Sequence, residues 1–179
     1  ETVLNNFIIN TGIILQSIQN TYYLISEKQK NIVRNEYKTL FKDYRFKGPQ
    51  LITVGLNNII EKRYEDYKNG ISIRKNYTVT DKADGERNLL IVASDSRVYL
   101  LNRRDDIKYL GCKLPNLEGT IMDGELIQKD KHGNPISLFM VFDIYFHKNT
   151  DTRDRVLNRS EEQKVIGKLD KSRLEILSE

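Results

Sequence analysis

Residues 77–93 read YTVTDKADGERNLLIVA, and this stretch sets the fold class. In its first six residues, Tyr77, Val79 and Asp81 alternate with residues of the opposite face, and a period of two is typical of a β-strand. Residues 88–93 form a second strand-like run, and the charged segment KADGER separates the two runs. The stretch therefore predicts two β-strands joined through a turn.

The strand pattern continues toward the C-terminus. Residues 98–101, 120–127 and 137–144 are further strand-like runs, with turn residues between them. Short strands on short connections favour a mostly antiparallel sheet over alternating β-α-β units. From Arg153 onward the chain is charged, which predicts a helix or an exposed tail.

Before residue 48 the apolar residues follow a helical period. They recur at helical spacing over residues 14–25 and again over residues 32–44. Ser26 followed by Gln29 has the form of a capping box at the start of the second of these helices. A shorter helix is predicted at residues 56–69.

These patterns predict an α+β fold in two segments. Residues 1–47 are expected to be a mostly helical segment from an upstream domain, and residues 48–179 an antiparallel sheet with flanking helices. Hydrophobic residues make up 39% of the 179, which suffices for a core and excludes a disordered or fibrous protein. The single cysteine, Cys112, excludes a disulfide framework, and the net charge of +4 is compatible with an anionic partner.

Residues 2–26 carry no charge, which raises the question of a membrane span. Asparagine and glutamine residues interrupt this segment, and it contains no apolar run near the roughly 20 residues that a bilayer requires. We therefore expect a buried helix here and no membrane partner.

Lys82, Asp84, Gly85 and Arg87 form the pattern K-x-D-G-x-R in the turn between the first two strand-like runs. A lysine amine becomes nucleophilic when burial and cationic neighbours favour its neutral form. Arg87 offers a planar fork for ribose or phosphate oxygens. These four residue types are also common in charged β-turns, so the pattern alone leaves that alternative open.

Two further motifs lie on the later strands. Asp123 and Glu125 stand in an otherwise apolar strand, where carboxylates predict either a polar or metal site or an exposed β-bulge. Phe142 is a core residue unless it lines a nucleotide pocket, where it would be a platform for base stacking. The Arg103-Arg104 pair either binds phosphate or pairs with the two aspartates that follow it.

Together the three motifs resemble those of the covalent nucleotidyltransferase superfamily, which comprises mRNA capping enzymes and ATP-dependent polynucleotide ligases. In the family's order, residues 82–87 look like motif I, residues 123–126 like motif III and residues 141–144 like motif IIIa. Ligases usually carry a glutamate two residues before the lysine, where this chain has Thr80. Residues 77–85 look most like the multidomain capping enzymes of poxviruses and other large cytoplasmic DNA viruses.

The resemblance implies roles for individual residues. Lys82 would attack the α-phosphate of GTP, carry GMP as a lysyl-Nζ–GMP intermediate and pass it to the 5′-diphosphate end of RNA. Arg87 and Arg103 would hold the ribose. Glu125 would lie near the ribose or a bound Mg²⁺ or Mn²⁺, and Phe142 would stack on guanine. The nucleotide-binding residues so implied are Thr80, Asp81, Asp84, Gly85, Arg87, Arg103, Glu125 and Phe142.

The resemblance also implies a context for this chain. The family's motifs IV and V and its OB-fold lobe are not recognisable after Ile144, so residues 48–179 are expected to be an incomplete guanylyltransferase lobe of a longer protein. The expected partners are GTP, the 5′ end of RNA, and triphosphatase and methyltransferase domains in the same polypeptide or complex. The expected location is the host cytoplasm, in a viral factory, and the virion.

Two alternatives stay open at this point. The first is an ATP-dependent RNA or DNA ligase that works through a lysyl-AMP intermediate. The second is a nucleotidyltransferase-like module that binds RNA without catalysis.

Overall fold

The chain forms two compact units. One comprises residues 1–47 and 83–179 and the other residues 48–82, and each is described by itself. The predicted division into residues 1–47 and 48–179 stays a prediction. The computed structural model describes residues 2–43, 45–46, 48–49, 52–59, 73, 77–159 and 170–179.

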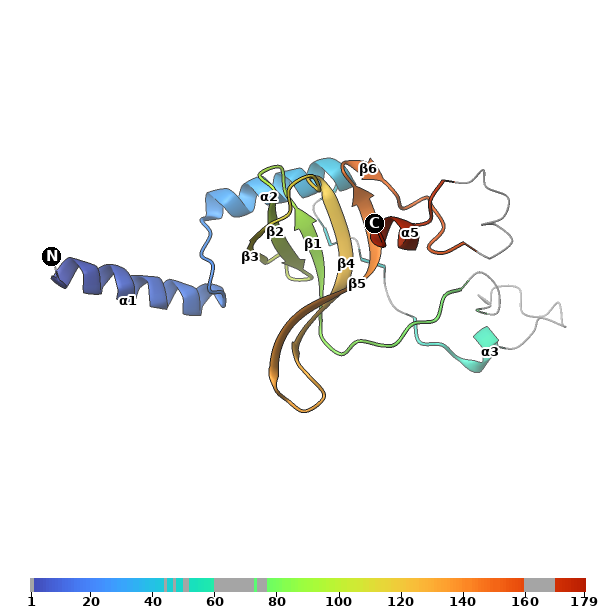
Figure 1. The fold of residues 1–179 in the computed structure, drawn as a ribbon, viewed down its shortest axis with the longest axis horizontal. Helices are drawn as coiled ribbons and strands as arrows, with labels where there is room; N and C mark the ends of the chain where they lie inside the picture. Colours follow the sequence, from blue (N-terminus) through green and yellow to red (C-terminus); the bar gives the residue numbers. More distant parts are fainter. Residues whose placement is uncertain are drawn as a thin grey trace. The chain divides into compact units, whose positions relative to one another are not determined.

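An antiparallel sheet of six strands organises the first unit (Figure 1). Its strands lie in the order β3-β2-β1-β4-β5-β6, and every neighbouring pair is antiparallel. The predicted α+β fold is therefore confirmed. Strands β1, β2, β4 and β5 correspond to the four predicted runs after residue 87, whereas β3 and β6 were not predicted. The strands are β1 (Glu86–Val92), β2 (Arg97–Asn102), β3 (Ile107–Lys113), β4 (Thr120–Lys129), β5 (Pro135–His147) and β6 (Thr150–Asp151).

Both faces of the central strands are buried. Helix α2 (Glu27–Phe41) packs on one face through Val33, Tyr37 and Phe41. Ser26 accepts a hydrogen bond from the backbone N–H of Gln29 at 3.2 Å, which confirms the N-cap half of the predicted capping box, while the Gln29 side chain donates to Asp95 and Tyr99. Burial on two faces explains why β1 and β2 have continuous apolar runs rather than alternating ones. The other face carries a second apolar cluster, built on Leu90, Val92, Val98 and Leu100.

Strands β4 and β5 form a long hairpin that continues beyond the other strands (Figure 1). Their pairing shifts register, and one shift leaves Phe142 without an opposite residue on β4. Another shift lets the successive residues Tyr145 and Phe146 both join the core that α2 covers. Such bulges re-aim side chains relative to a regular strand, and here they do so at one of the three predicted motifs.

The N-terminal helix differs from its prediction. Helix α1 spans Thr2–Gln19 and ends there because Asn20 adopts a left-handed conformation with φ 47°. Ile25, predicted within this helix, is a buried core residue outside it. None of the side chains of α1 is buried, so the predicted buried helix is wrong: an uncharged sequence permits burial, but burial requires a packing partner. In the part of the chain that the structure describes, no helix is long and apolar enough to cross a membrane.

The charged C-terminal segment contains one described helix, which lies close to the end of the chain. Helix α5 (Arg173–Leu177) begins with a capping box between Ser172 and Glu175. Arg173 forms an ion pair of 3.2 Å with Asp143 on β5, which attaches the helix to the sheet. The charged segment after Arg153 thus contains a short helix, and residues 160–169 of the predicted helix or tail lie outside the described residues.

The second unit contains one described helix, α3 (Leu56–Ile59), at the start of the helix predicted over residues 56–69. Residues 60–69 of that prediction lie outside the described residues. Residues 77–82 are exposed and pair with no strand among the described residues, so the strand predicted there is wrong. Alternating Thr and Val favour an extended backbone, but a strand forms only where a neighbour completes its hydrogen bonds.

Candidate functional site

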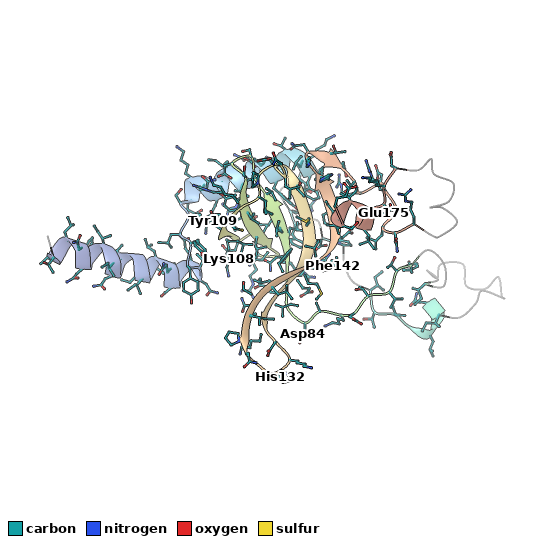
Figure 2. The ribbon with its side chains drawn as sticks, viewed as in Figure 1. Asp84, Lys108, Tyr109, His132, Phe142 and Glu175 are labelled. Atoms are coloured by element: carbon teal, nitrogen blue, oxygen red, sulfur yellow. The ribbon has the colours of Figure 1, made fainter. Side chains whose placement is uncertain are left out.

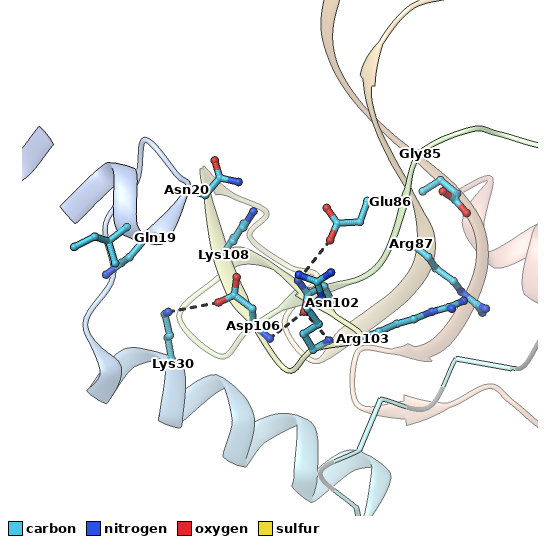
Figure 3. Close-up of a pocket in the computed structure, with 13 residues that line it drawn as sticks. Gln19, Asn20, Lys30, Gly85, Glu86, Arg87, Asn102, Arg103, Asp106 and Lys108 are labelled. Carbon is cyan, nitrogen blue, oxygen red and sulfur yellow. Dashed lines mark hydrogen bonds and ion pairs between the residues drawn. The ribbon is translucent and has the colours of Figure 1, made fainter. Parts of the chain in front are cut away.

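A cavity of about 770 Å³ opens at one end of the sheet in the first unit (Figure 3). Four of the predicted site residues line it, and they come from three parts of the fold: the start of β1, strand β4 and the turn after β2. The lining residues are Ile18, Gln19, Asn20, Lys30, Gly85, Glu86, Arg87, Asn102, Arg103, Arg104, Asp106, Lys108 and Glu125.

Gly85 is required at its position by close packing. A Cβ atom on this residue would lie 2.5 Å from the carbonyl oxygen of Leu126 and 3.3 Å from Oε2 of Glu125. Real Cβ atoms do not approach a backbone oxygen so closely, so glycine lets the backbone just before β1 lie directly against β4. This contact brings the first and second predicted motifs together at the cavity.

Arg87 is the most strongly held of the predicted residues. Its side chain is 7% exposed, its Nε donates to Oδ1 of Asp123 at 3.0 Å, and its Nη2 donates to Oδ2 of the same carboxylate. The hydroxyl of Tyr145 also donates to Asp123. These hydrogen bonds to Asp123 raise the pKa of Arg87 above its ordinary value, so the guanidinium is charged at any working pH.

Phe142 contacts this arginine. The Cζ atom of Arg87 lies 5.6 Å from the centre of the Phe142 ring and 5.9 Å from that of the Phe46 ring, which are cation–π distances. Phe142 is half-buried and is not among the described residues that line the cavity. Its predicted stacking on guanine stays a prediction, whereas its contact with Arg87 is part of the structure.

Glu125 faces Arg87 across the β1–β4 pair, as their strand register shows. Its Oε2 atom is buried and accepts no hydrogen bond from any residue in the described ranges. An unpartnered buried carboxylate oxygen is costly, so Glu125 fits a ligand that supplies a hydroxyl group or a cation. No group of three or more His, Cys, Asp or Glu residues that could hold a metal ion occurs within the described ranges.

The turn after β2 presents Arg103 and Arg104 to solvent. The two aspartates beside them pair with helix α2 instead: Asp105 with Nε of Arg34 at 3.1 Å and Asp106 with Nζ of Lys30 at 3.6 Å. The alternative of a self-paired turn is therefore wrong, because residues of α2, distant in sequence, supply the partners.

Sequence reasoning missed Lys108, which lies on β3 and lines the cavity (Figure 2). Strand β3 was not predicted, so there was no reason in the sequence to place Lys108 near the residues of the other motifs. Lys30 was missed as well, although the amphipathic pattern of α2 placed it on a predicted helix. A lysine that is only 8% exposed indicates an anionic partner, and Lys30 has two: Glu27 at 3.4 Å and Asp106 at 3.6 Å.

The remaining predicted residues lie elsewhere. Asp84 belongs to the first unit and lines a different cavity, of about 610 Å³, beside the β4–β5 hairpin. Thr80, Asp81 and Lys82 belong to the second unit, where all three are exposed. The roles predicted for these four residues stay predictions.

Comparison with known proteins gives two findings. The family model described as "mRNA capping enzyme, catalytic domain" matches residues 26–169. A protein of Acanthamoeba polyphaga mimivirus named "Probable mRNA-capping enzyme" is 32% identical over 164 residues. The alignment covers 84% of this chain but 12% of the viral protein, so the chain spans only a small part of that relative's length. All the predicted site residues lie within the range that the family model matches.

Proposed function

Because the chain belongs to the mRNA capping enzyme family, through that family's catalytic domain, we propose that it transfers GMP from GTP to the 5′ end of RNA. The resemblance predicted from the three motifs is confirmed by both comparisons, and the mimivirus relative agrees with the likeness to enzymes of large DNA viruses.

One observation carries the proposal: residues of separate motifs surround a single cavity. Gly85 and Arg87 of the first motif, Glu125 of the second, and Arg103 after β2 all line it. Chance turns and surface acids would not converge in this way. Convergence of two arginines and an unpartnered carboxylate suits a ligand with both hydroxyl groups and phosphates.

In this proposal Lys82 is the nucleophile. Only Ala83 and Asp84 separate it from Gly85, and three residue steps of extended chain reach at most about 11 Å. The Nζ lone pair of Lys82 attacks the α-phosphorus of GTP, a P–N bond forms, the α–β P–O bond breaks with its electron pair, and pyrophosphate leaves. The Lys82 ammonium loses one proton to solvent before the attack, and the nitrogen loses a second proton to solvent once the P–N bond has formed. In the second step an oxygen of the RNA 5′-diphosphate attacks the same phosphorus, the P–N bond breaks as its nitrogen is protonated, and the free amine then takes up a second proton from solvent.

The arginines and Glu125 would bind the ribose and the metal ion. Arg103 and Arg87 would hold the ribose and its hydroxyl groups, as the resemblance implies, with Asp123 fixing the orientation of Arg87. Glu125 fits a site for Mg²⁺ or Mn²⁺, because such ions bind through one or two carboxylates together with substrate phosphates. When bound, the ion would neutralise charge that develops on the phosphates.

Guanylylation of the full-length protein tests the proposal. The protein is incubated with α-labelled GTP or ATP and a divalent metal ion, and an acid-labile, alkali-stable protein adduct is measured. We expect label from GTP, its loss in Lys82→Ala, and its retention in Lys113→Ala, a matched change of an exposed lysine on β3. Label from ATP alone would instead support a ligase, and no label from either nucleotide would support a non-catalytic module.

The wider context remains part of the proposal. The relative is much longer than this chain, which leaves room for the triphosphatase and methyltransferase domains expected from the resemblance. We propose, on the same basis, that capping takes place in the host cytoplasm.

A further inference from the structure

Three cationic side chains at the β2–β3 end of the 770 Å³ cavity lack an anionic partner among the described residues. Arg103 and Arg104 are exposed in the turn after β2, and Lys108 is half-buried on β3. Within the part of the chain that the structure describes, none of the three side chains forms a hydrogen bond or an ion pair. Concentrated cationic charge inside a concave surface attracts an anion.

The two aspartates of the same turn already have cationic partners. Helix α2 supplies Arg34 to Asp105 and Lys30 to Asp106, at 3.1 Å and 3.6 Å. Glu86 also lines the cavity, where its carboxylate accepts a weak hydrogen bond of 3.5 Å from the amide of Asn102. Figure 3 shows the ion pair between Lys30 and Asp106. Since both aspartates pair with α2, neither compensates the charge of Arg103, Arg104 or Lys108.

This cationic end is separate from the end that Glu125 occupies. Lys108 lies on β3 and Glu125 on β4, with β2 and β1 between them. Three steps of about 4.8 Å place the two strands roughly 14 Å apart. A nucleoside held by Glu125 and Arg103 leaves Arg104 and Lys108 available for a second charged group in the same cavity.

We propose that Arg104 and Lys108 bind a diphosphate group at the cationic end of the cavity. This inference rests on the proposed function. Arginine matches phosphate oxygens with a bidentate fork, and lysine adds a compact positive charge. The proposed reaction contains two such groups: the β,γ-diphosphate of GTP, which leaves as pyrophosphate, and the 5′-diphosphate of the acceptor RNA.

The test uses the full-length protein with Arg104→Ala, Lys108→Met and the double variant. Lys113→Ala is the matched control, because Lys113 is an exposed residue of the same strand outside the cavity. Three quantities are measured: the KM for GTP in adduct formation, the KM for pyrophosphate in regeneration of GTP from the adduct, and the KM for 5′-diphosphate RNA in GMP transfer. RNA with a 5′-hydroxyl serves as the reference ligand in filter binding.

Each single variant is expected to raise one of these KM values about tenfold, the effect of one charge-assisted contact. A rise for GTP and pyrophosphate identifies the leaving group as the occupant. A rise for RNA, together with loss of the preference for 5′-diphosphate over 5′-hydroxyl ends, identifies the acceptor. Lys108→Arg, which keeps the charge, is expected to restore most of the affinity.

The inference is overturned if no KM changes by more than about twofold, or if Lys113→Ala has an equal effect. A variant that loses its fold by circular dichroism is replaced by Lys108→Arg and Lys108→Gln, whose comparison isolates the charge. Failure of the wild-type protein to form any GMP adduct would refute the proposed function itself, which is a different result from unchanged KM values in an active protein.

Discussion

Replacement of Asp123 by alanine tests the buried ion pair at the centre of the site. Asp123 is fully buried and accepts hydrogen bonds from Arg87 and from the Tyr145 hydroxyl. The variant leaves a guanidinium that is 7% exposed without its counter-charge, and a tyrosine hydroxyl without its acceptor.

The expected loss of stability follows from these contacts. Removal of one partner from a buried pair costs about 3–5 kcal/mol, because the remaining charge is uncompensated. The unpaired Tyr145 hydroxyl belongs to the same network, so its cost overlaps with that of the charge. We expect a loss of about 4 kcal/mol in the free energy of opening β1 and β4, which is close to a thousandfold in their protection from exchange.

Hydrogen exchange measured by mass spectrometry suits this test. The chain contains no tryptophan, and exchange reports β1 and β4 separately within the full-length protein. Asp130→Ala is a matched control, because Asp130 is half-buried at the tip of the β4–β5 hairpin and accepts hydrogen bonds from nearby residues, His132 and Asn134. It should affect the hairpin tip and leave the protection of β1 unchanged.

A double-mutant cycle decides whether the pair acts as a unit. Arg87→Met together with Asp123→Leu should cost less than Asp123→Leu alone, because no buried charge remains. A loss below about 1 kcal/mol in Asp123→Ala, or strict additivity of the two single replacements, would refute the reasoning.

Three further outcomes are expected. Gly85→Ala should lower GMP-adduct formation about tenfold or more, because its Cβ would lie 2.5 Å from the Leu126 carbonyl oxygen; normal labelling would contradict this. Glu125→Gln should leave thermal stability unchanged or higher, since its Oε2 has no described partner, while labelling falls about 100-fold; a lower melting temperature with normal labelling would show a structural role only. Hydrogen bonds from Arg159 lower the pKa of Glu175 from 4.5 to about 2, so its stabilisation of α5 is complete above pH 4.5 and is lost as the pH falls toward 2. Exchange protection of α5 across this range should lose that dependence in Glu175→Gln, and persistence of the dependence would contradict the assignment.

Much of the sheet could be predicted because its signals are local. Strand-like runs and turn residues located β1, β2, β4 and β5, and the glycine in K-x-D-G-x-R indicated a tight turn. Strand β3 was missed because its sequence, IKYLGCK, has neither alternation nor a continuous apolar run. The strand predicted over residues 77–82 failed for the opposite reason: its residue types favour extension, but no neighbouring strand completes it.

The candidate site, too, was predictable only in part. The motif residues and their order along the chain are properties of the sequence, and so was their likeness to capping enzymes, which the comparisons confirm. Their partners were not predictable, because Arg87 meets Asp123 across 36 positions and Arg34 meets Asp105 across 71. Nothing in the sequence near either arginine indicates which carboxylate it contacts in the folded protein.

The sequence by itself therefore determined four of the six strands and the chemical types available to the site. Only the tertiary structure decided that Arg87 is clamped by Asp123, that helix α2 neutralises the aspartates after β2, and that Lys108 joins the cavity. The physical reason is range. Periodicity and turn preference act over a few residues, whereas burial and charge pairing depend on which distant segments pack together.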